Sequence, residues 1–171
     1  MLSPKIQEAL NKQVNAEMYS AYLYLAMSAY FDGMNLKGCA HWMRVQYDEE
    51  MVHAFKIYDF IGERGGEVAL EAIAKPDPKL ESPLGVFEEA LEHERKVTGM
   101  IHDLVALAME ERDYATNSFL QWFVDEQVEE EASVDEIVQQ LRMVSESKNG
   151  LFMVDRHLAD RQAAGASEPA E

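Results

Sequence analysis

Four long helical patterns, each with a glutamate near the middle of its apolar face, constrain this chain more than any other feature. Apolar residues at spacings of three and four predict four amphipathic helices, at about 4–30, 36–64, 83–111 and 114–144. The acids on these faces are Glu17, Glu50, Glu94 and Glu130. A buried carboxylate is costly unless a positive group compensates it. The helices must therefore pack in a way that gives these acids a cation or a proton.

Capping residues mark the ends of the predicted helices. Ser-Pro pairs at 3–4 and 82–83 each place a serine N-cap before a proline at the first helical position. Asp113 is the expected N-cap of the fourth helix, and Gly65 can adopt the left-handed conformation that ends the second. A short apolar helix is predicted at about 151–160, so we expect an all-α fold.

The connection between the second and third helices, residues 65–82, decides the predicted topology. It contains Pro76 and Pro78 and lacks a helical pattern, which is uncommon for a segment of this length in a compact domain. The second helix would be roughly 43 Å long, and the extended segment reaches at most roughly 60 Å. The segment can therefore cross the whole bundle. We expect parallel second and third helices in a four-helix bundle with one long crossover.

The four glutamates lie at matching distances from the predicted turns. The midpoint between Glu17 and Glu50 falls inside the first turn, and residues equidistant from such a turn share one level of an antiparallel pair. The midpoint between Glu94 and Glu130 likewise falls inside the turn that joins their helices. Parallel central helices then bring both pairs to within about one turn. His53 shares the face of Glu50, so one imidazole and four carboxylates meet in one core layer.

The composition of this layer predicts a pair of divalent cations. No lysine or arginine lies on an apolar face near it, so the carboxylates would otherwise have to be largely protonated. Glu50 and His53 form the Glu-x-x-His half-site of carboxylate-bridged di-iron and di-manganese proteins. Oxygen ligands with a single imidazole favour iron or manganese, and Gln127 lies one turn from Glu130. The alternative is a hydrated polar layer with shifted pKa values.

Other polar residues flank the layer. Tyr24 lies two turns from Glu17 on the same face, where it is either a hydrogen-bond partner of a ligand or a core aromatic. Glu49, Glu126 and Glu129 are next to the inward acids, and a solvated acidic face is the usual reason for such residues. Their density also suggests a satellite cation site. The remaining histidines have no partner at ligand spacing and are expected at the surface: His41, His93, His102 and His157.

Charge and cysteine content exclude several classes of function. The 15 basic and 32 acidic residues give a net charge of −17, which argues against a nucleic acid or an anionic membrane as partner. The single cysteine, Cys39, rules out a disulfide framework within the chain. The longest apolar run, 19–31, is too short to span a membrane, so we expect a cytoplasmic chain. One domain is predicted over 1–162, followed by a disordered tail at 163–171.

The chain resembles the ferritin family, specifically the non-haem ferritins of bacteria and archaea, over about residues 6–161. The residues that carry this resemblance are Asn15-Ala16-Glu17, Tyr24, Glu49 to His53, His93-Glu94 and the run from Asn117 to Glu131. The resemblance implies a ferritin-like four-helix bundle with one long crossover and a short fifth C-terminal helix. It also implies a ferroxidase cage of 24 subunits that oxidises Fe(II) with O₂ or H₂O₂ and stores a ferric mineral.

The resemblance assigns the iron ligands residue by residue. The first iron would be held by Glu17, Glu50 and His53. The second would be held by Glu50, Glu94 and Glu130, with Glu50 bridging and Gln127 close by. A third iron would use Glu49, Glu126, Glu129 and Glu130.

Related families make different predictions. Bacterioferritins carry a second Glu-x-x-His where this chain has Gln127 and Glu130, so their symmetric centre is not expected. Met51 matches their haem ligand, but this methionine also occurs in non-haem ferritins, and no haem is expected. A discrete di-iron oxidase or peroxidase without mineral storage is the main alternative function. A non-catalytic helical assembly protein is the other. The predicted fifth helix and the acidic balance favour the storage cage.

Overall fold

Five α-helices form the fold of the computed structural model, which describes residues 2–78, 81–144 and 147–162. They are α1 (Pro4–Gly33), α2 (Lys37–Glu63), α3 (Pro83–Glu110), α4 (Tyr114–Met143) and α5 (Lys148–Leu158). The described residues contain no strand. The predicted four-helix bundle with a fifth helix is therefore confirmed, and the predicted tail at 163–171 lies outside the described residues.

Local capping explains where these helices start. The hydroxyls of Ser3 and Ser82 accept hydrogen bonds from the third backbone amide after each of them, and Asp113 accepts one from Thr116 N at 3.1 Å. The fifth helix begins three residues earlier than expected, because the Ser147 hydroxyl accepts a bond from Gly150 N at 3.0 Å. The serine N-cap thus starts the helix in a polar segment that the apolar pattern alone did not include.

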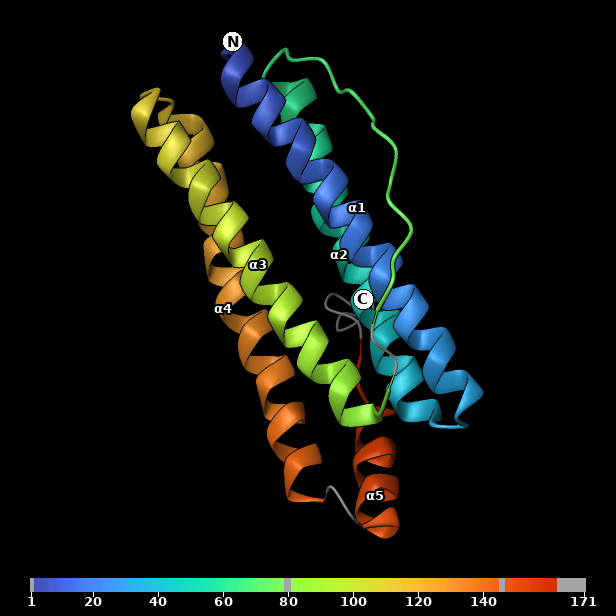
Figure 1. Cartoon of the computed structure of the whole chain (residues 1–171). Helices are drawn as coiled ribbons and strands as arrows, with labels where there is room; N and C mark the ends of the chain where they lie inside the picture. Colours follow the sequence, from blue (N-terminus) through green and yellow to red (C-terminus); the bar gives the residue numbers. More distant parts are fainter. Residues whose placement is uncertain (1, 79–80, 145–146, 163–171) are drawn as a thin grey trace, which may run out of the picture.

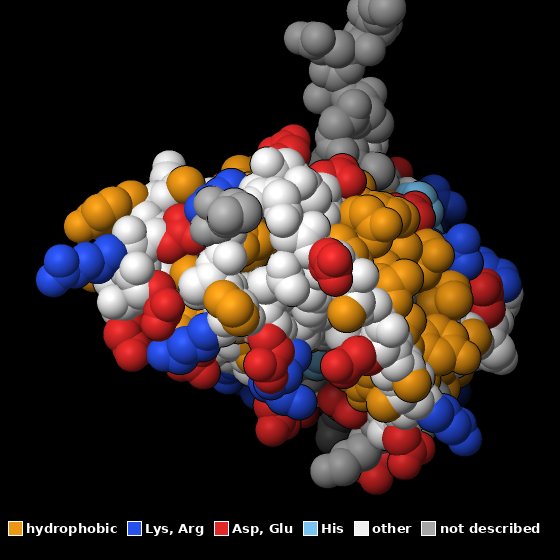
Figure 2. All heavy atoms as spheres, turned by 90° about the horizontal axis from the view of Figure 1, so that it is seen from above, with side chains coloured by type: hydrophobic (Ala, Val, Ile, Leu, Met, Phe, Trp, Pro, Cys, Tyr) orange, Lys and Arg blue, Asp and Glu red, His pale blue; other side chains and the backbone are white. Residues whose placement is uncertain are grey.

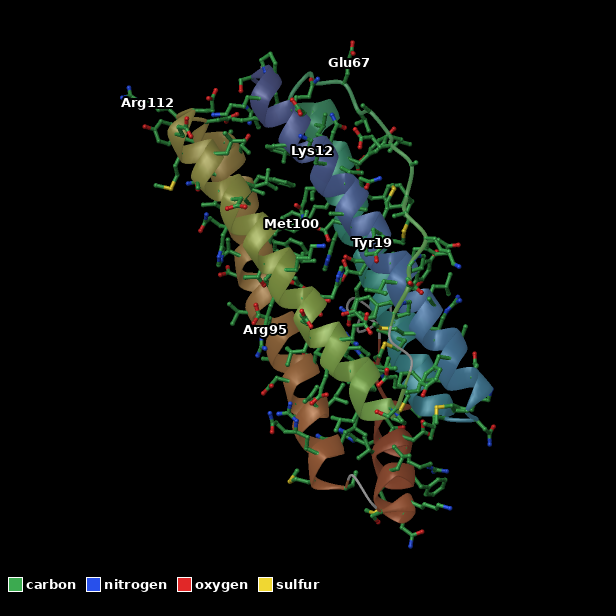
Figure 3. The ribbon with its side chains drawn as sticks, viewed as in Figure 1. Lys12, Tyr19, Glu67, Arg95, Met100 and Arg112 are labelled. Atoms are coloured by element: carbon green, nitrogen blue, oxygen red, sulfur yellow. The ribbon has the colours of Figure 1, made fainter. Side chains whose placement is uncertain are left out.

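The long connection runs along the outside of α1, so α2 and α3 are parallel, as predicted (Figure 1). Glu67, at the start of this connection, and Arg112, at the turn from α3 to α4, lie at the same end of the bundle (Figure 3). The buried amide of Asn11 secures the connection. Its Nδ2 donates to Glu67 O at 3.0 Å, and its Oδ1 accepts from Ala69 N at 2.8 Å. Side chains of α1 therefore replace the backbone partners that a structureless segment lacks.

The apolar core is divided into two clusters by a polar layer. One cluster, near α5, includes Phe31, Trp42 and Phe87. The other, toward the opposite end, includes Ile57 and Ile101. On each long helix, the inward glutamate lies between residues of the first cluster and residues of the second. The layer is thus closed off at both ends by packed side chains.

The short helix α5 docks against the start of α2. A Cβ added to Gly38 would lie 1.6 Å from the backbone oxygen of Asp155, so only a glycine permits this approach. The Asp155 carboxylate accepts a hydrogen bond from Cys39 N at 2.9 Å. The N-cap of α2, Leu36, makes no side-chain capping bond. Asp155 therefore caps α2 from another helix. None of the helices in the described part of the chain is long and apolar enough to cross a membrane.

Candidate metal centre

The four predicted glutamates come from four different helices and are all buried. Glu17, Glu50, Glu94 and Glu130 are 1%, 2%, 0% and 4% exposed, so bulk water does not solvate them. Their helices converge here because each apolar face carries its acid at the level where the two core clusters meet. The layer that the spacing predicted is therefore present in the fold.

His53 completes the inward set on α2. One ligand atom from each of Glu17, Glu50 and His53 lies within 4.8 Å of the other two, and all three residues are buried. The imidazole is 5.4 Å from the ring centre of Trp122 and 6.1 Å from that of Phe123, in edge-to-face packing. These contacts fix the ring without using its nitrogens, which leaves the nitrogens available to a metal.

Two carboxylate oxygens of the layer, Glu17 Oε2 and Glu50 Oε2, have no hydrogen-bond partner among the described residues. His53 Nδ1 is 3.5 Å from Glu50 Oε2, which is too far for an effective bond. The other oxygen of Glu17 accepts a bond from Gln13 Nε2 at 2.8 Å. Buried polar atoms without partners are rare and call for an explanation such as an ion. A cation between these oxygens satisfies both, so the residues present fit a metal.

Polar side chains orient the two acids of α3 and α4. The Tyr24 hydroxyl donates to Glu94 Oε1, so Tyr24 is a hydrogen-bond partner of one of the four buried acids rather than only a core aromatic. Gln127 Nε2 donates to Glu94 Oε2 at 3.3 Å, and Gln46 Nε2 donates to Glu130 Oε2 at 2.6 Å. Such bonds hold ligands in place before a metal arrives. Gln127 therefore contributes to the site as a hydrogen-bond donor to Glu94.

Burial controls the protonation of the layer. It raises the pKa of Glu17 to about 7 and that of Glu130 to about 8. The pKa of Glu50 is raised well above its ordinary value by burial and then by the nearby charges of Glu94 and Glu17. Burial lowers the pKa of His53 to about 4, which leaves a neutral imidazole with a free lone pair. Without a metal the layer therefore retains protons at neutral pH, and a divalent cation has to displace them.

These protonated acids predict an unusual pH dependence for the stability of the metal-free protein. Above pH 7 the folded state still binds protons at Glu17 and Glu130 that the unfolded chain has released. Glu17 and Glu130 alone then make stability fall as pH rises, by about 1–2 kcal/mol between about pH 7 and 9, and the raised pKa of Glu50 adds to the fall. His53 has little effect in this window because it is neutral in both states. Urea unfolding at several pH values, with and without Zn²⁺, measures the slope. A metal-free protein that gains stability across this window would contradict the assignment.

The predicted satellite residues are only partly brought together. Glu126 Oε1 lies 3.8 Å from His53 Nε2, and these two residues form a second possible ligand group with Glu130. Burial raises the pKa of Glu126, with further increases from the charges of Glu129 and Glu49. Glu126 is therefore placed between the layer and the acids closer to the surface. Glu49 instead pairs with Arg161, at 2.5 Å.

Sequence reasoning missed several residues of the site. Gln13 lies four residues before Glu17, the acid that it bonds, and this spacing was a usable signal. Gln46 bonds Glu130 of another helix, which the spacing within α2 does not predict. The surface prediction for His93 is wrong, because His93 is half-buried with its Nε2 2.8 Å from Ser20 Oγ. Burial also lowers the pKa of His93 to about 4. The other three predicted surface histidines are exposed, as expected: His41, His102 and His157.

Comparison with known proteins places this fold and site in a family. The family described as "Ferritin-like domain" matches residues 7–144, which span all four long helices. The chain belongs to the ferritin family. As a ferritin it is an iron-storage protein with ferroxidase activity. The predicted resemblance is confirmed over most of the chain.

The relatives of this ferritin match it along nearly their whole length. It is 44% identical to the bacterial non-heme ferritin of Bacteroides fragilis (strain 638R), over 94% of this chain and 100% of that protein. It is 40% identical to the bacterial non-heme ferritin of Staphylococcus saprophyticus, over 94% of this chain and 96% of the relative. Among solved structures, an open pore ferritin from the hyperthermophilic archaeon Archaeoglobus fulgidus is 54% identical. That likeness has a TM-score of 0.93 and covers 95% of this chain and 100% of the other.

Proposed function

We propose that each subunit of this ferritin oxidises Fe(II) at an internal two-iron centre and passes Fe(III) to a mineral inside the cage. The observation that carries this proposal is the pair of buried carboxylate oxygens without partners, Glu17 Oε2 and Glu50 Oε2. They lie in a layer to which all four long helices contribute an acid. A site of this kind binds cations and offers little to an organic substrate.

The ligand assignment combines the resemblance to non-haem ferritins with the positions of the side chains, which support it for the first iron. Glu17, Glu50 and His53, which lie within reach of one ion, are assigned to the first iron. Glu50, Glu94 and Glu130 are assigned to the second, with Glu50 shared between the two. Glu50 and His53 lie three residues apart on one helix face, so both can bind the first iron. Glu50 can then also bind the second iron as a shared ligand. Gln127 positions Glu94 by its hydrogen bond.

The donor set determines the chemistry. Carboxylates stabilise Fe(III) relative to Fe(II), so binding in this layer makes ferrous iron a stronger reductant. Two adjacent Fe(II) ions lose one electron each, and O₂ takes up both electrons with two protons to give H₂O₂. If H₂O₂ is the oxidant, two electrons and two protons give two waters. The acids that release protons on binding iron are Glu17 and Glu130, which hold them near neutral pH.

A satellite site for a third iron is part of this proposal. Its assigned ligands are Glu49, Glu126, Glu129 and Glu130. Glu126 supports this assignment because its carboxylate faces His53 on one side and responds to the charges of Glu49 and Glu129 on the other. An ion there is close to the two-iron layer and nearer to solvent. The site can thus receive iron on its way in or out.

The cage is proposed to contain 24 copies, and the surface supports association. Figure 2 shows hydrophobic side chains gathered on one side of the molecule, with charged side chains around them. Val52, Phe55 and Val128 are 62%, 50% and 69% exposed on the isolated chain. Apolar side chains that gather on one exposed face, as in Figure 2, mark an association surface. The cytoplasmic location, the absence of haem and the single domain over 1–162 stay predictions of the sequence.

Calorimetry under anaerobic conditions tests the two-iron centre. Metal-free protein titrated with Fe(II) should bind two ions tightly per chain and release protons, because protonated acids become ligands. Repeating the titration in buffers of different ionisation enthalpy counts the protons, and we expect about one to three per chain. Tight binding with no proton release would contradict the protonated layer. Failure to bind two ions would contradict the centre itself.

A further inference from the structure

Arg161, which follows α5, reaches back to the outer edge of the proposed metal centre. Its Nη2 donates to Glu49 Oε2 at 2.5 Å, and its Nη1 donates to Gln46 Oε1 at 2.8 Å. The guanidinium carbon lies 4.3 Å from the ring centre of Trp42. The side chains of Arg161 and Glu49 are only 20% and 14% exposed. Arg161 is thus held on three sides and differs from a loose surface ion pair.

Arg161 is also one side chain away from the inner layer. The Gln46 amide that accepts from Arg161 donates through its nitrogen to Glu130 Oε2 at 2.6 Å. The two bonds fix the orientation of this amide, because its oxygen faces a cation and its nitrogen faces a carboxylate. Both acids linked to the guanidinium, Glu49 directly and Glu130 through Gln46, are assigned ligands of the satellite site.

We propose that Arg161 is a built-in competitor for the cation of the satellite site. A guanidinium keeps its charge at every physiological pH, so it neutralises Glu49 in the way that a bound metal would. A metal ion can take Glu49 only after the guanidinium has moved away. This inference rests on the proposed function, since it presupposes the satellite site. It makes the occupancy of that site depend on the position of the C-terminal segment.

The structure offers a place for the displaced side chain. A hollow of about 320 Å³ opens between α4 and α5, and Arg161 and Trp42 already line it. Glu136 and Asp160, which carry carboxylates, line the same hollow. The guanidinium can therefore move from Glu49 into this hollow and still lie near a carboxylate. The docking of α5 through Asp155 and Cys39 keeps the segment close enough for it to return.

The test compares the binding of Zn²⁺, a redox-inactive probe, by metal-free assembled protein and its variants. In Arg161→Gln the third Zn²⁺ per chain should bind about tenfold or more tightly than in wild type, while the first two are unchanged, because a nearby positive charge is lost. Arg161→Lys keeps the charge and should stay close to wild type. Arg156→Gln removes the same charge from an exposed position on α5 and serves as the control.

A second variant shows whether the gain depends on Glu49. Adding Glu49→Gln to Arg161→Gln should remove the tight third site, because that ligand is gone. Third-site affinity that is the same in Arg161→Gln and wild type, or lower in the variant, would overturn the inference while the two inner ions still supported the proposed function. An equal increase in affinity for all three Zn²⁺ ions would also overturn the inference, because it would show a general effect of charge. Binding of no Zn²⁺ by any of these proteins would overturn both the proposed function and this inference.

Discussion

Replacing Glu50 by glutamine is expected to slow rapid Fe(II) oxidation by about 100-fold or more and, in the absence of metal, to stabilise the fold. Changes to partners of metal ligands alone often cost 10–100-fold, and Glu50 is assigned as the ligand shared by both irons. Glutamine has nearly the same shape as glutamate but no charge. It therefore removes the cost of protonating Glu50 when the metal-free chain folds at neutral pH, worth about 1–3 kcal/mol.

Two measurements on the Glu50→Gln variant distinguish a metal site from a polar layer that serves only the fold. Oxidation is followed by the absorbance of ferric product after mixing with Fe(II), and stability by urea unfolding of metal-free protein at neutral pH. Glu136→Gln, on an exposed position of α4, is the matched control and should change neither quantity. A variant that oxidises iron as fast as wild type, or that unfolds more easily without metal, would show that Glu50 serves the fold.

Replacing Gly38 by alanine is expected to detach α5 from the bundle. The new Cβ would lie 1.6 Å from the backbone oxygen of Asp155 and 2.6 Å from its carbonyl carbon. A backbone cannot move aside as a flexible side chain does, so the cost is about 3 kcal/mol or more. Detachment also removes the capping bond that the Asp155 carboxylate accepts from Cys39 N. The loss exceeds what a helical glycine-to-alanine change normally gains, about 1 kcal/mol.

Gly62, at the other end of α2, provides the control for this prediction. An added Cβ at Gly62 meets nothing within 4 Å, so Gly62→Ala should be neutral or stabilising. The two variants are compared by thermal unfolding and by the near-ultraviolet signal of Trp42, which contacts Arg161 beyond α5. Equal stability of Gly38→Ala and Gly62→Ala would mean that α5 does not need this close approach.

The bundle and its acids could be predicted because they follow from rules local to each helix. Apolar spacing and Ser-Pro starts indicate the helix limits, and the connection is long enough to cross the bundle. The acids stand out because Glu17 and Glu50 interrupt apolar faces. Spacing does not tell which of two neighbouring residues turns inward, however. Gln46 is buried, for example, whereas its more apolar neighbour Tyr47 is only partly so.

The partners of the site depend on tertiary contacts that no pattern carries. Arg161 lies beyond the last helix, and its place beside Glu49 depends on how α5 folds back onto α2. The burial of His93 likewise depends on Ser20 of another helix. Periodicity describes one helix at a time, so it cannot anticipate a residue that enters the site from a loop or across the bundle.

The retention of iron tests the central claim most directly. Metal-free protein is loaded aerobically with excess Fe(II) and passed through a sizing column, and iron and protein are counted in the eluted peak. We expect roughly tens of irons per chain in a particle far larger than one subunit. A small oligomer carrying only about two or three irons per chain, the capacity of a bundle-core site, would contradict storage and indicate a discrete di-iron oxidase or peroxidase.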